Sequence, residues 1–360
     1  MFLKNLTLQN FRSYEKADFD FDRKTLIVGP NTAGKSNIIE AISLLANGKS
    51  FKTDKDTQML KFGKEVGRVK GQINDTDLEV VLTLGEVEGK KTPTKKYLVN
   101  GVSKRRLDFM GNLQTVIFSP LDLEIIIGSP GIRRNFMDEV LEQVDFDYRV
   151  AFSEYEKGIR QRNSLLDLTR KQLHRDLKQF EYWDNLVIKY GNIITQKREE
   201  LTAYLDSEEK HIFDFGVVYD KSVISQERLL QYQEEEKIVG VTLVGPHRDD
   251  LIFEMFDNET QTARNIKFFG SRGQQRLTVL QIKLLQLAFF EETHSASSGQ
   301  AKNESPLLLL DDIFSELDEE HIVHVLEMLK DRDSIITTTH EEFVPQKYLD
   351  GVKIIKLSIK

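Results

Sequence analysis

The sequence predicts an α/β fold in which a long helical segment interrupts a region of strands. Short apolar runs typical of strands lie on both sides of residues 147–205, and inside that range apolar residues recur every three or four positions. None of the seven prolines lies within residues 131–245, which favours uninterrupted helices there. We therefore expect a discontinuous α/β domain of residues 1–137 and 238–360, and a helical lobe of residues 138–237.

Length and composition fit an ordinary globular chain of about two domains. The 360 residues are 39% hydrophobic and 30% charged, and the formal charge of −8 excludes a surface that is basic throughout. Any site for DNA would therefore be a local patch. The absence of cysteine excludes disulfides, thiolate metal sites and cysteine nucleophiles. No run approaches the roughly 20 apolar residues that a membrane-spanning helix needs, so we expect no membrane partner and a cytoplasmic location.

The remaining elements follow from local patterns. Residues 147–205 are interrupted only by Gly158 and Gly191, which predicts two or three long amphipathic helices. Residues 293–306 are small, polar and rich in hydroxyl groups, and they predict a mobile loop. Runs of β-branched, aromatic and leucine residues predict strands at Phe2–Leu8, Thr25–Val28, Val66–Ile73, Leu78–Leu84, Tyr97–Val99, Val116–Phe118, Val239–Leu243, Leu251–Phe256 and Leu307–Leu310.

The run GPNTAGKS at residues 29–36 lies between an expected strand and the helical pattern NIIEAISLLA. In such a loop, consecutive backbone N–H groups and the helix N-terminus point at the β- and γ-phosphates of a nucleotide such as ATP. The lysine adds a cation, and the serine hydroxyl can ligate Mg²⁺. The alternative is a glycine turn that happens to precede a lysine. The expected nucleotide-binding residues are Gly29, Asn31, Thr32, Ala33, Gly34, Lys35, Ser36 and Asn37.

A run of four leucines at residues 307–310 ends in two aspartates, which is typical of a central strand that carries a carboxylate to a phosphate site. We expect Asp311 to bind Mg²⁺ together with Ser36, usually through water. Asp312 would polarise the attacking water, so that Asp312 and Lys35 are the candidate catalytic residues. The alternative is that the paired aspartates, or residues 315–318, only cap the next helix.

The run FGSRGQQR at residues 269–276 predicts a second anion site, because a small, glycine-bearing turn opens a helix there. Two phosphate-binding turns in one chain imply a nucleotide enclosed between them, with Ser271, Gly273 and Gln274 on the second side. The alternative is a serine-capped helix in which Gly273 permits a tight turn. His340 follows another apolar run that comes after the Asp311 strand, and it is the third candidate catalytic residue, with a structural or solvated histidine as the alternative.

The most basic local patch lies in residues 90–106. It holds seven basic residues and no acid, and Asn100–Gly101 between apolar positions predicts a hairpin turn that carries this charge. Such a patch attracts phosphates without reading bases, although a solvated hairpin is the alternative. The candidate DNA-binding residues are Lys90, Lys91, Lys95, Lys96, Lys104, Arg105 and Arg106.

The order of these elements resembles an ABC-type ATPase head, in which a P-loop sheet accompanies an antiparallel β subdomain. Within that class the sequence resembles the RecF family of bacterial recombination-mediator ATPases over essentially its whole length. Two departures from the family pattern are Leu121, where an acidic residue is usual, and Arg272, where glutamine is commoner. The resemblance rests on NFRSY at residues 10–14, GSPGIRRNFMD at 128–138, GPHRDDL at 245–251 and DDIFSELD at 311–318.

The resemblance implies that two subunits associate head to tail. Ser271 and Gly273 of one subunit would cover ATP held by the other, Arg12 would lie near the nucleotide, and His340 would meet the γ-phosphate. It further implies an ATP-dependent protein that binds gapped or double-stranded DNA in repair, hydrolyses ATP slowly as a switch, and promotes RecA loading with RecO and RecR. One alternative is the cytosolic ATPase subunit of an ABC transporter. The lack of a glutamine after residues 116–118 and the interposed helical lobe argue against it. Another alternative is a clamp that binds ATP but scarcely hydrolyses it.

Overall fold

The computed structural model describes residues 2–53, 55–171, 177–257, 261–298, 305–315 and 319–358. The chain forms two compact units, one of residues 1–122 and 283–360 and the other of residues 123–282. These limits differ from the lobe limits expected at residues 138 and 237, and those remain a prediction. Within the described ranges, no helix is long and apolar enough to cross a bilayer.

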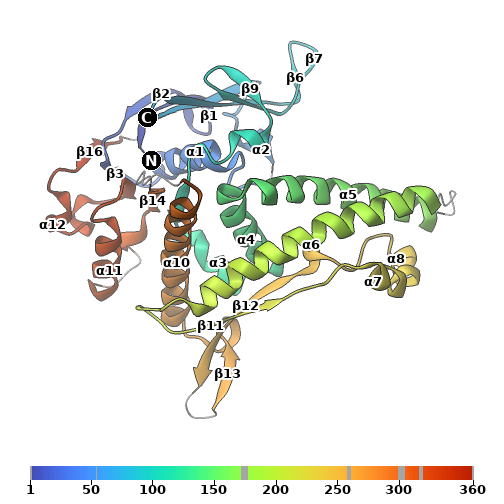
Figure 1. Ribbon diagram of the computed structural model, residues 1–360. Helices are drawn as coiled ribbons and strands as arrows, with labels where there is room; N and C mark the ends of the chain where they lie inside the picture. The colour runs from blue at the N-terminus through green and yellow to red at the C-terminus, as the bar shows by residue number, and fades with distance from the viewer. Residues whose placement is uncertain are drawn as a thin grey trace. The chain divides into compact units, whose positions relative to one another are not determined.

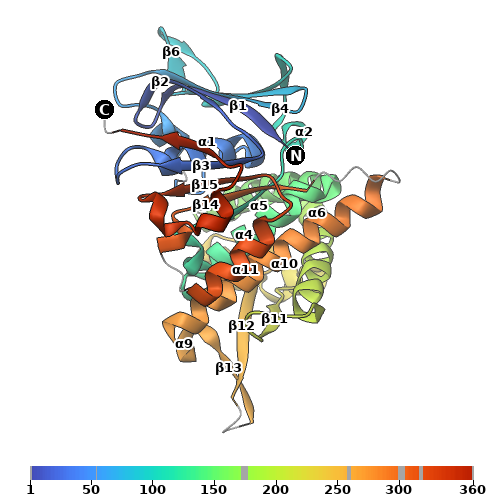
Figure 2. The ribbon, with the colours of Figure 1, turned by 90° about the vertical axis from the view of Figure 1, so that its left-hand side faces the viewer.

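The first unit is built around a parallel sheet of five strands (Figures 1 and 2). Its order is β10 (Thr115–Phe118), β14 (Leu307–Asp311), β15 (Ser334–Thr338), β3 (Lys24–Val28) and β16 (Lys353–Lys356). β14 and β15 are buried along their whole length, which the four leucines of β14 predict. Because neighbouring strands are parallel, their carboxyl ends meet at one edge of the sheet.

An antiparallel sheet of six strands forms the second layer of this unit, and helix α1 (Lys35–Asn47) packs against both sheets. The shared core joins apolar residues of α1 to residues such as Leu6 and Val80 on one side and Leu309 and Ile335 on the other. The strand order is β2 (Tyr14–Asp20), β1 (Leu3–Phe11), β4 (Val66–Ile73), β5 (Thr76–Thr83), β8 (Lys95–Val99) and β9 (Val102–Lys104).

Short elements complete this unit. β6 (Glu86–Val87) and β7 (Lys90–Lys91) form a separate two-stranded hairpin. The turn between β8 and β9 has positive φ at Asn100 and Gly101, so the hairpin predicted there is confirmed. The remaining helices are η1 (Asp56–Met59), α2 (Arg106–Phe109), η2 (Pro120–Leu123), η4 (Ile313–Ser315), α11 (Glu319–Leu329), η5 (Glu341–Phe343) and α12 (Gln346–Leu349).

The second unit contains two long helices that lie side by side, α5 (Phe146–Arg170) and α6 (Leu177–Ser207), as predicted (Figure 1). A Cβ atom on Gly158 of α5 would come within 2.7 Å of α6 side chains, so the glycine permits close packing. The unit also contains α3 (Glu124–Ile127), α4 (Pro130–Val144), α7 (Gln226–Gln231), α8 (Gln233–Val239), η3 (Pro246–Arg248), α9 (Ile266–Phe269), the start of α10 (Arg272–Ser298), and a sheet of β11 (Gly216–Asp220), β12 (Asp250–Asp257) and β13 (Thr262–Asn265).

A buried ion pair network joins α4, α6 and the segment after η3. The Arg198 side chain is 2% exposed and donates to Asp138 Oδ1 at 2.7 Å and to Asp249 Oδ2 at 2.9 Å. Arg133 makes a bidentate pair with Asp250 at 2.7 and 2.9 Å. Arg133 thus pairs directly with Asp250, and Arg198 links Asp138 to Asp249. Residues 128–138 and 245–251 therefore depend on each other for their positions.

Two predicted elements are wrong. Residues 239–243 do not form a strand, because Gly240, with φ 80°, ends helix α8 and side chains bind the backbone that follows. Asn163 Oδ1 accepts from the Thr242 amide at 2.8 Å, and Glu236 Oε1 accepts from the Leu243 amide at 2.9 Å. Residues 293–298 belong to helix α10 rather than to the predicted loop. Residues 299–304 of that loop lie outside the described residues.

The stability of the second unit is expected to fall as the pH drops from about 6.5 to 4. Burial lowers the pKa of His247 to about 4, so the folded form binds fewer protons than the unfolded chain across that interval. Protonation of His247 therefore favours unfolding by about 3 kcal/mol at the acid end. The single tryptophan, Trp183, lies in α6 and reports urea unfolding of this unit by its fluorescence. The free energy of unfolding should differ less between pH 7 and pH 4.5 in His247→Gln than in the native protein. An equal difference in both proteins would show that His247 does not cause the pH dependence.

Candidate functional site

Residues 29–34 connect the carboxyl end of β3 to the N-terminus of α1, as the sequence predicts. Gly34 has φ 95°, and a Cβ atom there would lie 2.7 Å from the Tyr14 hydroxyl. Only glycine fits this conformation and this space. Asn31 and Thr32 are exposed at the tip of the loop. The loop therefore presents its backbone and the start of α1 at the sheet edge, where an anion can bind.

Lys35 is 6% exposed and folds back over this loop. Its Nζ donates to the carbonyl oxygens of Gly29 at 2.7 Å and Pro30 at 3.1 Å. Burial lowers the pKa of Lys35, and the charges of Asp312 and Asp311 oppose this shift. A cation whose hydrogen bonds go to neutral carbonyls would be stabilised by a bound anion such as a phosphate.

Ser36, Asp311 and Thr337 are linked at the same edge. Asp311 Oδ1 accepts from Ser36 Oγ at 2.9 Å and from Thr337 Oγ1 at 2.7 Å. The Asp312 amide donates to Thr337 Oγ1 at 3.1 Å, and Asp312 has φ 54°. The structure thus brings together the serine and the two aspartates that the sequence selected. The structure adds Thr337 to this group. In the sequence ITTTH at residues 336–340, nothing sets Thr337 apart from the two threonines that follow it.

The segment NFRSY packs on the loop. Tyr14 Oη donates to the Gly34 carbonyl at 3.2 Å, and burial raises the pKa of this tyrosine to about 12. Asn37 Nδ2 donates to Ser13 Oγ at 3.0 Å. Arg12 makes a bidentate pair, at 2.9 and 2.5 Å, with Glu40, whose side chain is fully buried in α1. The guanidinium of Arg12 is thus held in place beside α1, and its contact with a nucleotide remains a prediction.

Sequence reasoning missed two charged residues of this region. Glu40 lies in an otherwise apolar stretch of α1, and a lone acid in such a stretch was the available signal. Lys52 follows α1, and its Nζ donates to the Ser36 carbonyl at 2.9 Å. Burial lowers the pKa of Lys52, while Asp311 and Glu40 raise it. Nothing in the local pattern near Lys52 distinguishes it from other surface lysines.

His340 follows β15, whose carboxyl end lies at the same sheet edge as the loop. Its side chain is exposed and lies edge-on to Phe343, with ring centroids 5.4 Å apart. The predicted contact with a γ-phosphate stays a prediction. Of the segment 311–318, Glu316, Leu317 and Asp318 lie outside the described residues, so the alternative that they cap α11 stays open.

The turn at residues 270–274 belongs to the second unit and opens helix α10. Ser271 Oγ accepts from the backbone N–H of Gln274 at 3.2 Å, and Gln274 Oε1 accepts from the backbone N–H of Ser271 at 2.8 Å. This reciprocal pair is a capping box. The serine therefore does cap the helix. Among the described residues, a Cβ atom on Gly273 would meet only Ser271 Oγ, at 3.9 Å, and φ at Gly273 is not positive. In the described part of the chain, therefore, neither turn geometry nor packing requires glycine at position 273.

The basic patch divides into three sets. Lys95 donates to the Gly48 carbonyl at 3.0 Å and pairs with Asp56 at 2.9 Å, and Arg106 donates to the Asn47 carbonyl at 3.0 and 3.2 Å, so both side chains support the C-terminal end of α1. Arg105 is exposed and pairs with Asp108 at 2.8 Å. The side chains that extend from the hairpins into solvent are Lys90, Lys91, Lys96 and Lys104.

Comparisons with known proteins agree with this architecture. The model of the family described as "RecF/RecN/SMC N terminal domain" matches residues 2–357. The chain is 32% identical to the DNA replication and repair protein RecF of Gloeothece citriformis over 99% of this chain and 98% of that protein. It is 34% identical to RecF of a Cyanothece species, with 99% and 97% of the two chains covered.

Solved structures show the same fold. A structure described as the recombination mediator protein RecF-ATPrS in the RecFOR pathway superposes with a TM-score of 0.82 at 27% identity, covering 100% of this chain and 96% of that one. The corresponding RecF-ATP structure gives a TM-score of 0.83 at 28% identity, covering 95% and 93%. The fold is therefore an α/β ATPase head of the ABC and SMC type. The chain belongs to the RecF/RecN/SMC family, within its RecF branch of DNA replication and repair proteins, which confirms the resemblance found in the sequence.

Proposed function

We propose that this protein is an ATP-dependent DNA-binding protein of recombinational repair, in which ATP binding closes a dimer and slow hydrolysis opens it. The observation that carries this proposal is the arrangement at the carboxyl edge of the parallel sheet. There the loop of residues 29–34, Lys35, and the linked Ser36 and Asp311 lie together at the N-terminus of α1, where we expect a triphosphate to bind. One of the similar solved structures is described as RecF-ATP, which supports ATP as the nucleotide here.

The residues at this edge fit Mg²⁺ as well as the nucleotide. Ser36 Oγ and Asp311 Oδ1 are hard oxygen donors 2.9 Å apart, and bound Mg²⁺ would neutralise charge on the phosphates. Among the described residues, no group of three or more histidine, aspartate or glutamate side chains could hold a metal ion. The remaining ligands would therefore be phosphate oxygens and water, as is usual for magnesium at phosphate sites.

Asp312 would act as the base that polarises the attacking water, and His340 would meet the γ-phosphate. The Asp312 amide is anchored to Thr337, which also holds Asp311, so the two aspartates are fixed relative to each other. The Asp311 carboxylate contacts Ser36 and would hold the metal, and the Asp312 carboxylate would face the attacking water. A site that serves as a switch needs only slow turnover, because binding and release carry the signal.

The second half of the nucleotide site would come from another copy of the chain. The open space beside Gly273 supports this, since nothing in the described part of this chain needs that space. The Ser271 hydroxyl and the first amides of α10 would contact the γ-phosphate held by the other copy. Arg272 adds a positive charge beside this contact. Loss of the γ-phosphate removes the contact and releases the pair.

Through its family we further propose that the dimer binds gapped or double-stranded DNA and promotes RecA loading with RecO and RecR in the cytoplasm. Both similar structures are described as parts of the RecFOR pathway, which supports these partners. Lys90, Lys91, Lys96 and Lys104 are the side chains best placed to attract phosphates, because they extend into solvent from two hairpins of one unit.

DNA binding tests this proposal directly. The native protein should bind a fluorescent gapped duplex more tightly with ATP than with ADP. Changing Lys90, Lys91, Lys96 and Lys104 to glutamine together should lower the affinity and reduce the slope of log affinity against log salt by about 3. Glutamine at Lys157, Lys210, Lys221 and Lys237 makes the same charge change in the second unit and is the control. An unchanged salt slope in the hairpin variant would exclude these lysines, and equal binding with ATP and ADP would contradict the switch.

A further inference from the structure

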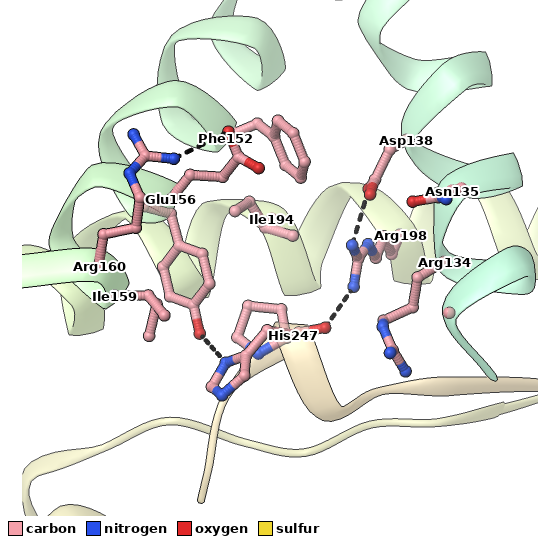
Figure 3. A pocket seen from close by; sticks show the side chains of 13 residues that line it. Arg134, Asn135, Asp138, Phe152, Glu156, Ile159, Arg160, Ile194, Arg198 and His247 are labelled. Carbon is pink, nitrogen blue, oxygen red and sulfur yellow. Dashed lines mark hydrogen bonds and ion pairs between the residues drawn. The ribbon is translucent and has the colours of Figure 1, made fainter. Parts of the chain in front are cut away.

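The two motifs that the proposed function leaves unused, at residues 128–138 and 245–251, meet at one pocket of the second unit. Figure 3 shows this pocket between α4, α5, α6 and the turn at η3, with a volume of about 360 Å³. Pockets that bind ligands begin at about 300 Å³. The lining includes Arg134 and Asp138 from the first motif and His247 from the second.

The floor of the pocket is rigid because its polar groups are already hydrogen-bonded. Arg198 is held by Asp138 and by the Pro246 carbonyl, at 2.7 Å each. His247 Nε2 lies 3.1 Å from the Thr242 carbonyl and must donate to it, so Nδ1 accepts from the Tyr155 hydroxyl at 2.8 Å (Figure 3). Such a floor is preorganised and does not need to rearrange when a ligand enters.

An apolar wall and a polar rim complete the pocket. Phe152 and Ile159 are half-buried, so a ligand entering here would cover their apolar surface, whereas Ile194 in the lining is already fully buried. Glu156 and Arg160 are exposed on the adjoining turns of α5 and form an i,i+4 ion pair at 3.8 Å. An apolar centre surrounded by solvent-exposed charged residues is the anatomy of a protein interface rather than of an enclosed metabolite site.

Arg134 provides the polar anchor of this pocket. Its Nη1 donates to the Asp249 carbonyl at 2.5 Å, and within the described part of the chain this is its single hydrogen bond. The acceptor is neutral, and Nε and Nη2 are left to bind a ligand. The pKa of Arg134 is lowered by burial and by the charge of Arg198, and a bound anion would offset both effects. A carboxylate is the group that a guanidinium binds in a bidentate way.

We propose that this pocket binds a segment of a partner protein in which an apolar side chain lies next to a carboxylate. The apolar side chain covers Ile159 and Phe152, and the carboxylate pairs with Arg134. The rest of the segment continues over the charged rim. The volume accommodates about one aromatic side chain with its neighbour, which suits a short anchor and not a large free cofactor.

Methyl NMR of the full chain with labelled isoleucines tests the pocket, because Ile159 and Ile194 lie in its wall. Ile159→Val and Ile194→Val assign the two signals. The probes are acetyl-Gly-Phe-Asp-Gly-amide, its asparagine analogue and free 3-phenylpropionate. The aspartate peptide should shift both methyl signals and bind about tenfold more tightly than the asparagine peptide. It should also bind more tightly than 3-phenylpropionate, because only the peptide contacts the rim.

Two variants and a control separate the contribution of the Arg134–carboxylate contact from that of the charged rim. Arg134→Gln should remove the preference for aspartate over asparagine. Arg160→Glu changes only an exposed rim residue, so it should fold normally and weaken the aspartate peptide several-fold by charge repulsion. Lys157→Gln, on the same helix but outside the pocket, should have no effect. The proposal is overturned if no probe shifts the two methyls, or if both peptides bind native protein equally. Free 3-phenylpropionate binding as tightly as the peptide would indicate a small-molecule site instead.

Discussion

Asp312→Asn is expected to reduce ATP hydrolysis by about 10²- to 10⁴-fold while ATP binding stays close to that of the native protein. The amide has nearly the same shape as the carboxylate but cannot take a proton from water. Asparagine also tolerates the positive φ of 54° found at this position, so the backbone should keep its course. Phosphate release measures hydrolysis, and equilibrium titration with a fluorescent ATP analogue measures binding.

Asp311→Asn is the matched comparison, because the neighbouring carboxylate contacts Ser36 and is assigned to the metal. That variant should lose Mg²⁺-dependent ATP binding, whereas Asp312→Asn should keep it and hold the dimer for longer. Unchanged turnover in Asp312→Asn would show that another group polarises the water. Equal loss of binding in both variants would show that the two aspartates do not have separate roles.

Ser271→Asp is expected to bind ATP and remain a monomer under conditions in which the native protein dimerises. Aspartate caps a helix as well as serine does, so α10 should start at the same place. Its negative charge would oppose a γ-phosphate presented by the second copy, and the repulsion should weaken association by about tenfold or more. Sedimentation velocity with and without ATP measures the association.

Ser271→Asn is the control for the shape of the new side chain, since it has the size of aspartate, caps equally well and carries no charge. It should dimerise with ATP much more strongly than Ser271→Asp. If both variants dimerise like the native protein, the serine serves only as a cap and the nucleotide is not shared at this turn. If neither variant binds ATP, the turn acts within a single chain.

The parts of the fold that sequence reasoning predicted are those fixed by local pattern. Four leucines before two aspartates require a buried strand with carboxylates at its end, and β14 has this form. The glycine, lysine and serine of residues 29–36 predict a strand, an anion-binding loop and a helix, and these occur at β3 and α1. Periodic apolar residues predicted α5 and α6. In each case the information lies within about ten neighbouring residues.

Contacts between distant residues could not be predicted in this way. Glu40 pairs with Arg12, 28 positions away, and the pair depends on α1 lying against the antiparallel sheet. Residues 240–243 look like a strand, but Asn163, 79 positions before Thr242, binds that backbone instead. Lys95 and Arg106 read as free basic charge, whereas each has a partner near α1. Such partners become known only when the tertiary structure is known.

If the space beside Gly273 receives the nucleotide of a second copy, as proposed above, helix stability and activity favour different residues at this position. Alanine forms helices better than glycine, by about 0.5–1 kcal/mol in a helix interior, and no neighbour in the described chain resists the added methyl group. Selection for thermal stability alone would therefore favour alanine at this position. In the proposed dimer, the glycine would leave room for the nucleotide of the second copy, at some cost in the stability of the first turn of α10.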